Sequence, residues 1–159
     1  MWTPSDVPTQ EILSTCAADH ARRAARTITR AYDQALAPCG LTITQFTMLV
    51  MLSRRSFDSI TEMADELALE RSSLSRNLSR LDQRDLVQRT DDGRARRITI
   101  TEAGRDKVQE AYPLWRETQR QVEDELGWAE WGDARMLLRR LADRGASLER
   151  QIDASGGAV

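Results

Sequence analysis

Apolar residues recur every three or four positions near the N-terminus, which is the spacing of a helix with one apolar stripe. Many of them are alanine, so another helix can approach this stripe closely. Pro38 and Gly40 end the pattern. We therefore expect a helix over residues 10–37, preceded by a flexible arm at residues 1–9. The stripe consists of Ile12, Leu13, Cys16, Ala17, Ala21, Ala24, Ala25, Ile28, Ala31, Tyr32, Ala35 and Leu36.

Two further helix starts are marked by a hydroxyl residue with an amide or carboxylate three positions later. Thr42 with Gln45 is the first such capping box, and Ser59 with Glu62 is the second. In a capping box the two side chains satisfy each other's free backbone N–H groups. Two short helices should begin at these points.

A third short helix is predicted over residues 71–83, because Leu74, Leu78 and Leu81 are spaced i, i+4, i+7. This narrow apolar stripe leaves a wide polar face outside it. Serine is a poor choice for a merely solvated helix face, so the composition indicates a binding surface. The face carries Ser72, Ser73, Ser75, Arg76, Ser79 and Arg80.

Two short strands and two long helices complete the chain. Residues 86–89 and 97–100 are the predicted strands, joined by the turn residues 91–93. Thr101 can cap a helix that runs to about residue 126, and Gly127 separates it from a last apolar-striped helix. The order predicts a mainly α (α+β) fold. A winged helix-turn-helix lobe at 40–100 would be joined to a helical dimerisation region at 10–39 and 101–152, with a disordered tail at 153–159.

Positive charge is concentrated in residues 71–100, which hold eight arginines and four acidic residues, a net charge of +4. The whole chain is −2, so the rest sums to −6. A basic polar helix followed by a basic hairpin is what a winged helix needs to bind double-stranded DNA, with the helix in the major groove and the hairpin tip at the neighbouring backbone or minor groove.

The DNA contacts are predicted on that helix and hairpin. Arg76 and Arg80 lie one turn apart and could each donate two hydrogen bonds to guanine, while short serines would let the helix sit deep. Two hairpin arginines are interpreted differently. Arg97 is expected to pair within the protein, and Arg89 fits a phosphate contact or a salt bridge equally well. The predicted DNA-binding set is Ser72, Ser73, Ser75, Arg76, Arg80, Asp92, Arg94 and Arg96.

Three segments resemble the multiple antibiotic resistance regulators (MarR family), and the likeness extends over about residues 12–150. GLTITQFTMLVML at 40–52 is similar to the family's second helix. SITEMADELALERSSLSRNLSRLDQRDLVQR at 59–89 is similar to its helix-turn-helix, and DGRARRITITEAGR at 92–105 to its wing. Two departures are Ala68, where the family usually has glycine, and Glu70 at the helix start, where Asp, Ser or Thr would cap better.

The resemblance implies a homodimer whose terminal helices form the base and whose two lobes hold a pseudo-palindromic operator. It implies that Arg94 enters the minor groove or binds its phosphates, positioned by Asp92, with Arg96 assisting. It also implies a transcriptional regulator, in most relatives a repressor, that a small, aromatic or anionic effector releases from DNA.

The effector pocket implied by the family lies where the helical base meets the lobe. By position, its candidate residues are His20, Arg23, Tyr32, Phe46 and Met48. A packed or solvated histidine and a solvated basic face are alternative readings of His20 and Arg23. A second alternative is oxidant sensing through the thiol of Cys16, although its place on the apolar stripe fits a small buried side chain equally well.

Other classes of protein are disfavoured. The two cysteines and the distant single histidine lack metal-ligand spacing, and the chain has no nucleophile elbow, phosphate loop or Gly-rich dinucleotide turn, so we expect no metal, no cofactor and no enzyme. A winged fold that serves only as a protein-binding adaptor would be expected to lose the polar face and the wing arginines. With no apolar run of about 20 residues and no secretion signal, the expected location is the cytoplasm, without a membrane partner.

Overall fold

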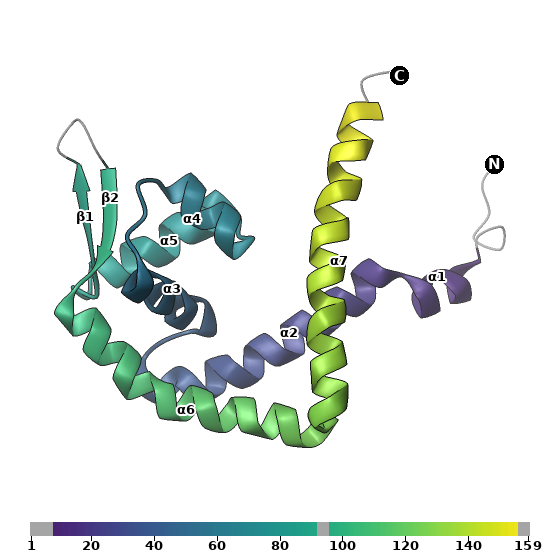
Figure 1. The fold of residues 1–159 in the computed structure, drawn as a ribbon, viewed down its shortest axis with the longest axis horizontal. Helices are drawn as coiled ribbons and strands as arrows, with labels where there is room; N and C mark the ends of the chain where they lie inside the picture. The colour runs from purple at the N-terminus through teal and green to yellow at the C-terminus, as the bar shows by residue number, and fades with distance from the viewer. Residues whose placement is uncertain (1–7, 92–95, 156–159) are drawn as a thin grey trace. The chain divides into compact units, whose positions relative to one another are not determined.

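The computed structural model describes residues 8–91 and 96–155 and confirms the predicted order of helices and hairpin (Figure 1). Two compact units divide at Trp115 and Arg116, within one continuous helix. The elements are α1 (Thr9–Thr15), α2 (Ala17–Leu36), the 3-10 turn η2 (Ala37–Cys39), α3 (Ile43–Arg54), α4 (Ile60–Leu67), α5 (Arg71–Asp82), β1 (Val87–Asp91), β2 (Arg96–Ile100), α6 (Glu102–Leu126) and α7 (Trp128–Ser155).

The first capping box forms in full at the start of α3. The Thr42 hydroxyl accepts a hydrogen bond from the Gln45 backbone N–H, and the Gln45 side-chain oxygen accepts one from the Thr42 N–H, both at 3.2 Å. These bonds satisfy two N–H groups that the helix itself leaves free. The sequence prediction of a helix start at this point is confirmed.

The second box forms only in part, because the Glu62 carboxylate has other partners. The Ser59 hydroxyl accepts from the Glu62 N–H at 3.0 Å as expected. The carboxylate instead accepts from the Asp58 N–H at 3.2 Å and from Arg55 Nη1 at 2.7 Å. Arg55 also binds Glu66 and lies 3.9 Å from the centre of the Phe57 ring. This guanidinium therefore joins the end of α3 to α4.

The predicted long first helix is interrupted at Cys16, which separates α1 from α2. Its backbone is extended there, with φ −66° and ψ 107°. The Ser14 and Thr15 hydroxyls both donate to the Glu11 carbonyl oxygen, at 3.1 and 2.7 Å. Hydroxyl side chains that bond the preceding turn compete with helix continuation. The apolar stripe runs across the break without marking it.

The core of the first unit lies among α3, α4, α5 and the hairpin. Leu74, Leu78 and Leu81 are fully buried, which confirms the apolar stripe of α5 as the packed side. Burial of such side chains contributes about 1.5–3 kcal/mol each. The other core residues are Leu36, Cys39, Leu41, Phe46, Met48, Leu49, Leu52, Phe57, Met63, Ala64, Leu86, Val87, Ile98, Ile100 and Ala111.

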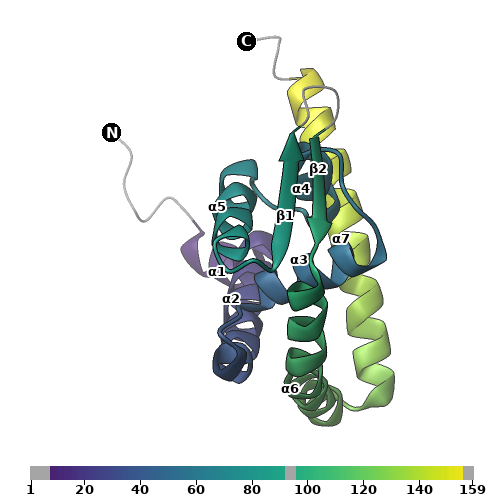
Figure 2. The ribbon, with the colours of Figure 1, turned by 90° about the vertical axis from the view of Figure 1, so that its left-hand side faces the viewer.

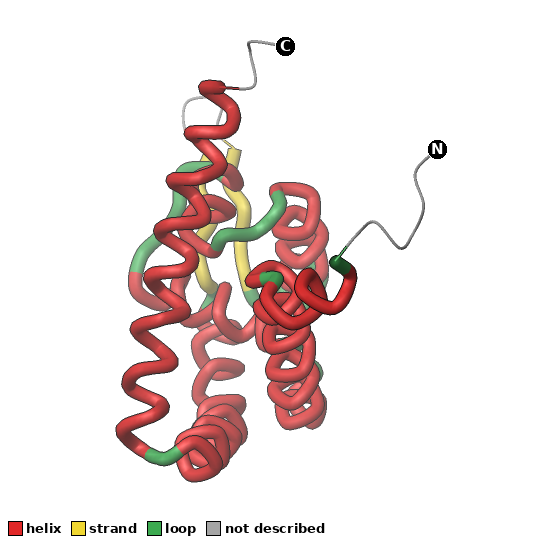
Figure 3. The backbone as a smooth tube through the Cα atoms, turned by 90° about the vertical axis from the view of Figure 1, so that its right-hand side faces the viewer, coloured by secondary structure: helices red, strands yellow, loops and turns green. Residues whose placement is uncertain are grey.

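The two strands form an antiparallel hairpin in which Val87 pairs with Ile100 and Asp91 with Arg96 (yellow in Figure 3). Both strands extend beyond the predicted ranges toward the turn. Phe57 adds an isolated bridge to Ile98, with backbone hydrogen bonds of 3.1 and 2.8 Å. Figure 2 shows β1 and β2 side by side with α5 next to β1. The hairpin is thereby fixed to the three-helix lobe.

The second unit contains the end of α6 and all of α7. Gly127, at φ +81°, makes the predicted break between these helices. No described residue of α7 is buried, and the helix continues to Ser155, past its predicted end at residue 152. Large apolar side chains of α7 are more than half exposed: Trp128, Met136, Leu137, Leu138, Leu141, Leu148 and Ile152.

Among the described residues, no single helix is long and apolar enough to cross a membrane. Ala17–Cys39 and Ile43–Arg54 pass the test of length and composition only as a pair, across a bend of 72°.

Candidate nucleic-acid interface

The helix α5 turns its apolar stripe into the core and its polar side outward. Ser72, Arg76 and Arg80 are exposed, and Ser73 and Ser75 are half-buried. All five α5 residues of the predicted DNA-binding set thus lie outside the leucine stripe. Within the described part of the chain, neither Arg76 nor Arg80 has a hydrogen-bond or ion-pair partner. Two guanidinium groups on one helix face are therefore available to a ligand.

The turn before α5 accommodates both departures from the family pattern. Ala68 takes the left-handed conformation, with φ 50° and ψ 44°, which glycine adopts at lower cost. Glu70 stands at the N-cap of α5 and makes no side-chain capping bond. Its carboxylate still suits the positive end of the helix dipole. The turn thus forms without glycine and without a side-chain cap.

The predicted wing contacts fall mostly outside the described residues. Asp92 and Arg94 lie there entirely. Arg96 is placed by its backbone, which pairs with Asp91 at the start of β2. The contacts of these three residues with DNA remain predictions.

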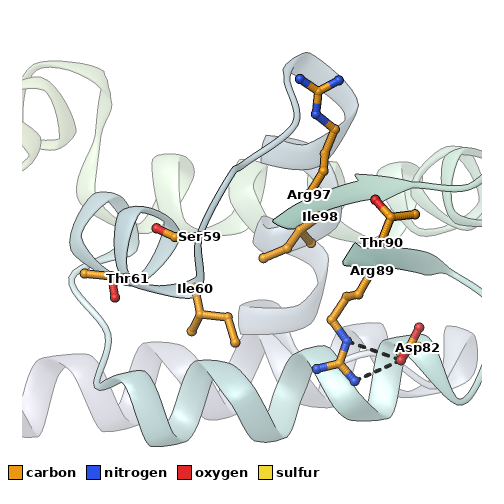
Figure 4. Close-up of a pocket in the computed structure, with 8 residues that line it drawn as sticks. All are labelled: Ser59, Ile60, Thr61, Asp82, Arg89, Thr90, Arg97 and Ile98. Carbon is orange, nitrogen blue, oxygen red and sulfur yellow. Dashed lines mark hydrogen bonds and ion pairs between the residues drawn. The ribbon is translucent and has the colours of Figure 1, made fainter. Parts of the chain in front are cut away.

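A groove of about 520 Å³ lies between α4, the end of α5 and the hairpin (Figure 4). Arg89 forms a salt bridge with Asp82, with Nη2 2.9 Å from Oδ2. The sequence had left a salt bridge and a phosphate contact as equal alternatives for this residue. Arg97 pairs with Asp58 at 3.6 Å, as expected of a residue that pairs within the protein. The groove is lined by Ser59, Ile60, Thr61, Asp82, Arg89, Thr90, Arg97 and Ile98.

Sequence reasoning did not single out Asp82, Thr61 or Thr90 as part of a site. Arg89 follows Asp82 by seven positions, and the turn that reverses the chain after α5 lies between them. Their pairing therefore depends on tertiary geometry rather than on a repeat along one helix. Opposite charges on either side of that turn are the signal that could have indicated it.

The five effector candidates lie in different surroundings in the described part of the chain. His20 and Arg23 are exposed on α2, whereas Tyr32, Phe46 and Met48 are buried. Phe46 stacks on Trp115 with ring centres 6.2 Å apart. His20 and Tyr32 are twelve residues apart on one helix, about 18 Å at 1.5 Å per residue. None of the five lines the groove, and their role as an effector site stays a prediction.

The two cysteines lie in different surroundings. Cys16 is half-buried at the break between α1 and α2, and Cys39 is buried after α2. Burial raises the pKa of the Cys39 thiol, and the Glu110 carboxylate that accepts its hydrogen bond raises it further. Lys107 Nζ, 2.5 Å from the same carboxylate, is the largest cause of the lowered pKa of Glu110.

A helix-turn-helix with free arginines on its second helix, joined to a two-stranded wing, defines a winged-helix transcription regulator. The comparisons agree. A family model described as MarR family matches residues 40–98. No curated protein matches the chain.

Solved structures extend the likeness to most of the chain. The M. tuberculosis transcriptional regulator MosR is 38% identical, covering 86% of this chain and 97% of its own, with a TM-score of 0.73. The structure of MosR in complex with DNA is 39% identical, covers 85% of this chain and 97% of its own, and has a TM-score of 0.72. A probable transcriptional regulator from Pseudomonas aeruginosa is 28% identical, covers 81% of this chain and 98% of its own, and has a TM-score of 0.72. The chain belongs to the MarR family. These relatives are described as transcriptional regulators.

Proposed function

We propose that this regulator binds a pseudo-palindromic DNA operator as a homodimer and represses transcription in the cytoplasm until a small effector releases it. The observation that carries the proposal is the outer face of α5, where Arg76 and Arg80 are exposed and have no partner among the described residues. A guanidinium can donate two parallel hydrogen bonds to guanine in the major groove. MosR, which is 39% identical, has been crystallised in complex with DNA.

The short side chains beside these arginines support an approach to DNA. Ser72 is exposed and Ser73 and Ser75 are half-buried, so none of them would hold the helix away from the base edges. The wing completes the interface in this proposal. Arg94 would bind the minor groove or its phosphates, with Asp92 positioning it and Arg96 assisting.

The apolar stripe of α7 supports assembly with a second copy. Leu141, Leu148 and Ile152 are 54%, 57% and 66% exposed. A contiguous exposed apolar patch marks an interaction surface, and a twofold dimer would cover the same patch on both copies. Residues 10–39 and 101–152 would then form the dimer base, and residues 40–100 the DNA-binding lobe.

The effector in this proposal is a small aromatic or anionic molecule bound near His20, Arg23, Tyr32, Phe46 and Met48. The alternative is release by oxidation of Cys16. The thiol of Cys16 is half-buried at a helix break. This position supports oxidation at Cys16, since an oxidant can reach it more easily than the buried Cys39.

The proposal is tested by selecting bound sequences from a pool of random double-stranded DNA and titrating the selected duplex against salt. Six or more phosphate contacts per dimer would give a log–log slope of about −5 or steeper. Arg94→Ala should weaken binding at least tenfold with little change in Tm. Arg76→Ala should change the preferred bases, because its contact would carry about 1–3 kcal/mol of discrimination.

Arg30→Ala is the matched control, because it removes an exposed arginine from α2, and it should leave affinity and base preference unchanged. Wild-type affinity in Arg94→Ala would contradict the wing assignment. An unchanged sequence preference in Arg76→Ala would contradict base reading by that residue. A wild-type protein that selects no sequence and shows no salt-dependent binding would refute the function itself.

A further inference from the structure

The ion pair between Asp82 and Arg89 uses only part of the arginine's hydrogen-bonding capacity. Nε and Nη2 both donate to Asp82 Oδ2, at 3.3 and 2.9 Å. Nη1 has no acceptor among the described residues. Figure 4 shows this third nitrogen turned away from the carboxylate, along α5 and toward Ile60 at the groove. The guanidinium is thus held from one side and open on the other.

The pair stands beside the proposed reading face of α5. Asp82 follows Ser75 and Ser79 at the spacing i, i+4, i+7, which places the three on one edge of the helix. When a helix enters the major groove, its edges face the phosphates that flank the groove. The guanidinium beside this edge would attract such a phosphate, and the Asp82 carboxylate competes with the phosphate for it.

The ion pair between Asp82 and Arg89 is weak enough for Arg89 to exchange Asp82 for another partner. Both side chains are 37% exposed. Exposed pairs of this kind change an equilibrium by no more than about fivefold. A hydrogen bond between a guanidinium and a phosphate is charge-assisted, and each phosphate that is neutralised also releases counterions. A DNA phosphate can therefore compete successfully with Asp82.

We propose that Asp82 holds Arg89 in the free protein and that Arg89 transfers to a backbone phosphate at the groove when DNA binds. The inference rests on the proposed DNA-binding function and goes beyond it, because it assigns a phosphate-binding site outside the predicted contact set. Asp82 is a positioning residue that acts through Arg89. It keeps the guanidinium beside the reading face, and it weakens DNA binding by competing with the phosphate for that guanidinium.

The test compares Asp82→Asn, Arg89→Gln and the double variant on the duplex that the wild type selects from random DNA. The glutamine keeps part of the arginine's stem, and a thermal unfolding curve for each variant confirms that it is folded. Asp65→Asn is the matched control, because it removes an exposed charge from α4 that has no arginine partner among the described residues.

If Arg89 transfers from Asp82 to a DNA phosphate, Asp82→Asn should bind the duplex about threefold to fivefold tighter than Asp65→Asn at the same salt concentration. Arg89→Gln should bind more weakly, with a log–log salt slope reduced by about 0.9 per protomer. The double variant should match Arg89→Gln, because the effect of Asp82 is exerted only through that arginine.

Three results would overturn the transfer while leaving the proposed function intact. Asp82→Asn could bind no tighter than Asp65→Asn. It could increase affinity equally when Arg89 is already replaced, which would indicate a general charge effect. Arg89→Gln could leave the salt slope unchanged, which would indicate a pair that stays closed. If the wild type itself shows no salt-dependent DNA binding, the proposed function fails first and the transfer with it.

Discussion

The carboxylate of Asp33 in α2 accepts a hydrogen bond from the backbone N–H of Ile43, with Oδ1 2.7 Å from the nitrogen. Ile43 is the first residue of α3, so its N–H has no acceptor within the helix. The negative charge also suits the positive end of the helix dipole. One side chain of α2 therefore stabilises the start of the helix that carries much of the core.

Replacing Asp33 by alanine should lower the free energy of unfolding by about 1–2 kcal/mol, because a half-buried N–H loses its acceptor. Asparagine should restore part of the loss. Urea denaturation measures the change. Asp106→Ala, which removes an exposed carboxylate from α6, should change stability by less than about 0.5 kcal/mol. Equal losses in the two alanine variants would contradict the role of the cap.

Gly104 allows α6 to lie directly against the chain that enters the hairpin. A Cβ at this position would be 2.1 Å from the Leu86 carbonyl oxygen and 2.7 Å from Ile100 Cγ1. Neither neighbour can move freely, since both are buried beside the hairpin. Gly104→Ala should therefore lower the free energy of unfolding by about 3 kcal/mol, measured by urea denaturation.

The control for this prediction is Gly132→Ala in α7. A Cβ there meets nothing within 4 Å, and helix propensity favours alanine by up to about 1 kcal/mol. This variant should be as stable as the wild type or slightly more so. If both substitutions had the same effect, close packing at Gly104 would not be its cause.

Sequence reasoning succeeded where the determining interaction is local. The bond between Thr42 and Gln45 spans three residues, and the leucines of α5 repeat within one helix, so both can be read along the chain. The order of elements and the fold class follow from such signals. The break at Cys16 was missed because the apolar spacing continues across it; the hydroxyl bonds of Ser14 and Thr15 to the Glu11 carbonyl lie directly before the break.

The site was less predictable than the fold. The Asp82–Arg89 pair forms across a tight turn, and its only signal along the sequence is the opposite charge of the two residues on either side of that turn. Phe46 and Met48 were proposed as effector contacts from position alone; both are buried in the lobe, and their role as effector contacts stays a prediction. An apolar residue that fills a core and one that lines a ligand pocket have the same pattern along the sequence, so only packing separates them.

Cys39 should react much more slowly with thiol reagents than Cys16. Only the thiolate is the nucleophile. Burial and the Glu110 carboxylate raise the pKa of Cys39, so its thiolate fraction at pH 8 falls below that of an ordinary thiol and increases only at higher pH. In single-cysteine variants, Cys39→Ala should be labelled by an aromatic disulfide at least about tenfold faster than Cys16→Ser.

The same variants test the oxidant-sensing alternative. If peroxide lowers the DNA affinity of the wild type and of Cys39→Ala but leaves Cys16→Ser unaffected, the thiol of Cys16 is the sensor. DNA affinity that is insensitive to peroxide in all three proteins would end that alternative and leave a bound effector as the means of release.

Leu141 should be required for assembly, because it lies in the middle of the exposed stripe of α7. Leu138 and Leu148 lie three residues before it and seven after it, on the same side of the helix. Burying one leucine contributes about 1.5–3 kcal/mol, and twofold symmetry doubles the contribution. Leu141→Glu should therefore raise the Kd of the dimer by about a hundredfold or more, measured by light scattering across a dilution series.

Arg139→Glu is the control, since two residues along α7 place it on the opposite side of the helix, and it should leave the dimer intact. The monomeric Leu141→Glu protein should still fold, because no described residue of α7 is buried in the single chain. It should bind a half-operator with the affinity of one lobe and lose the gain from joining two half-sites. A Leu141→Glu protein that remains dimeric would exclude this stripe as the interface.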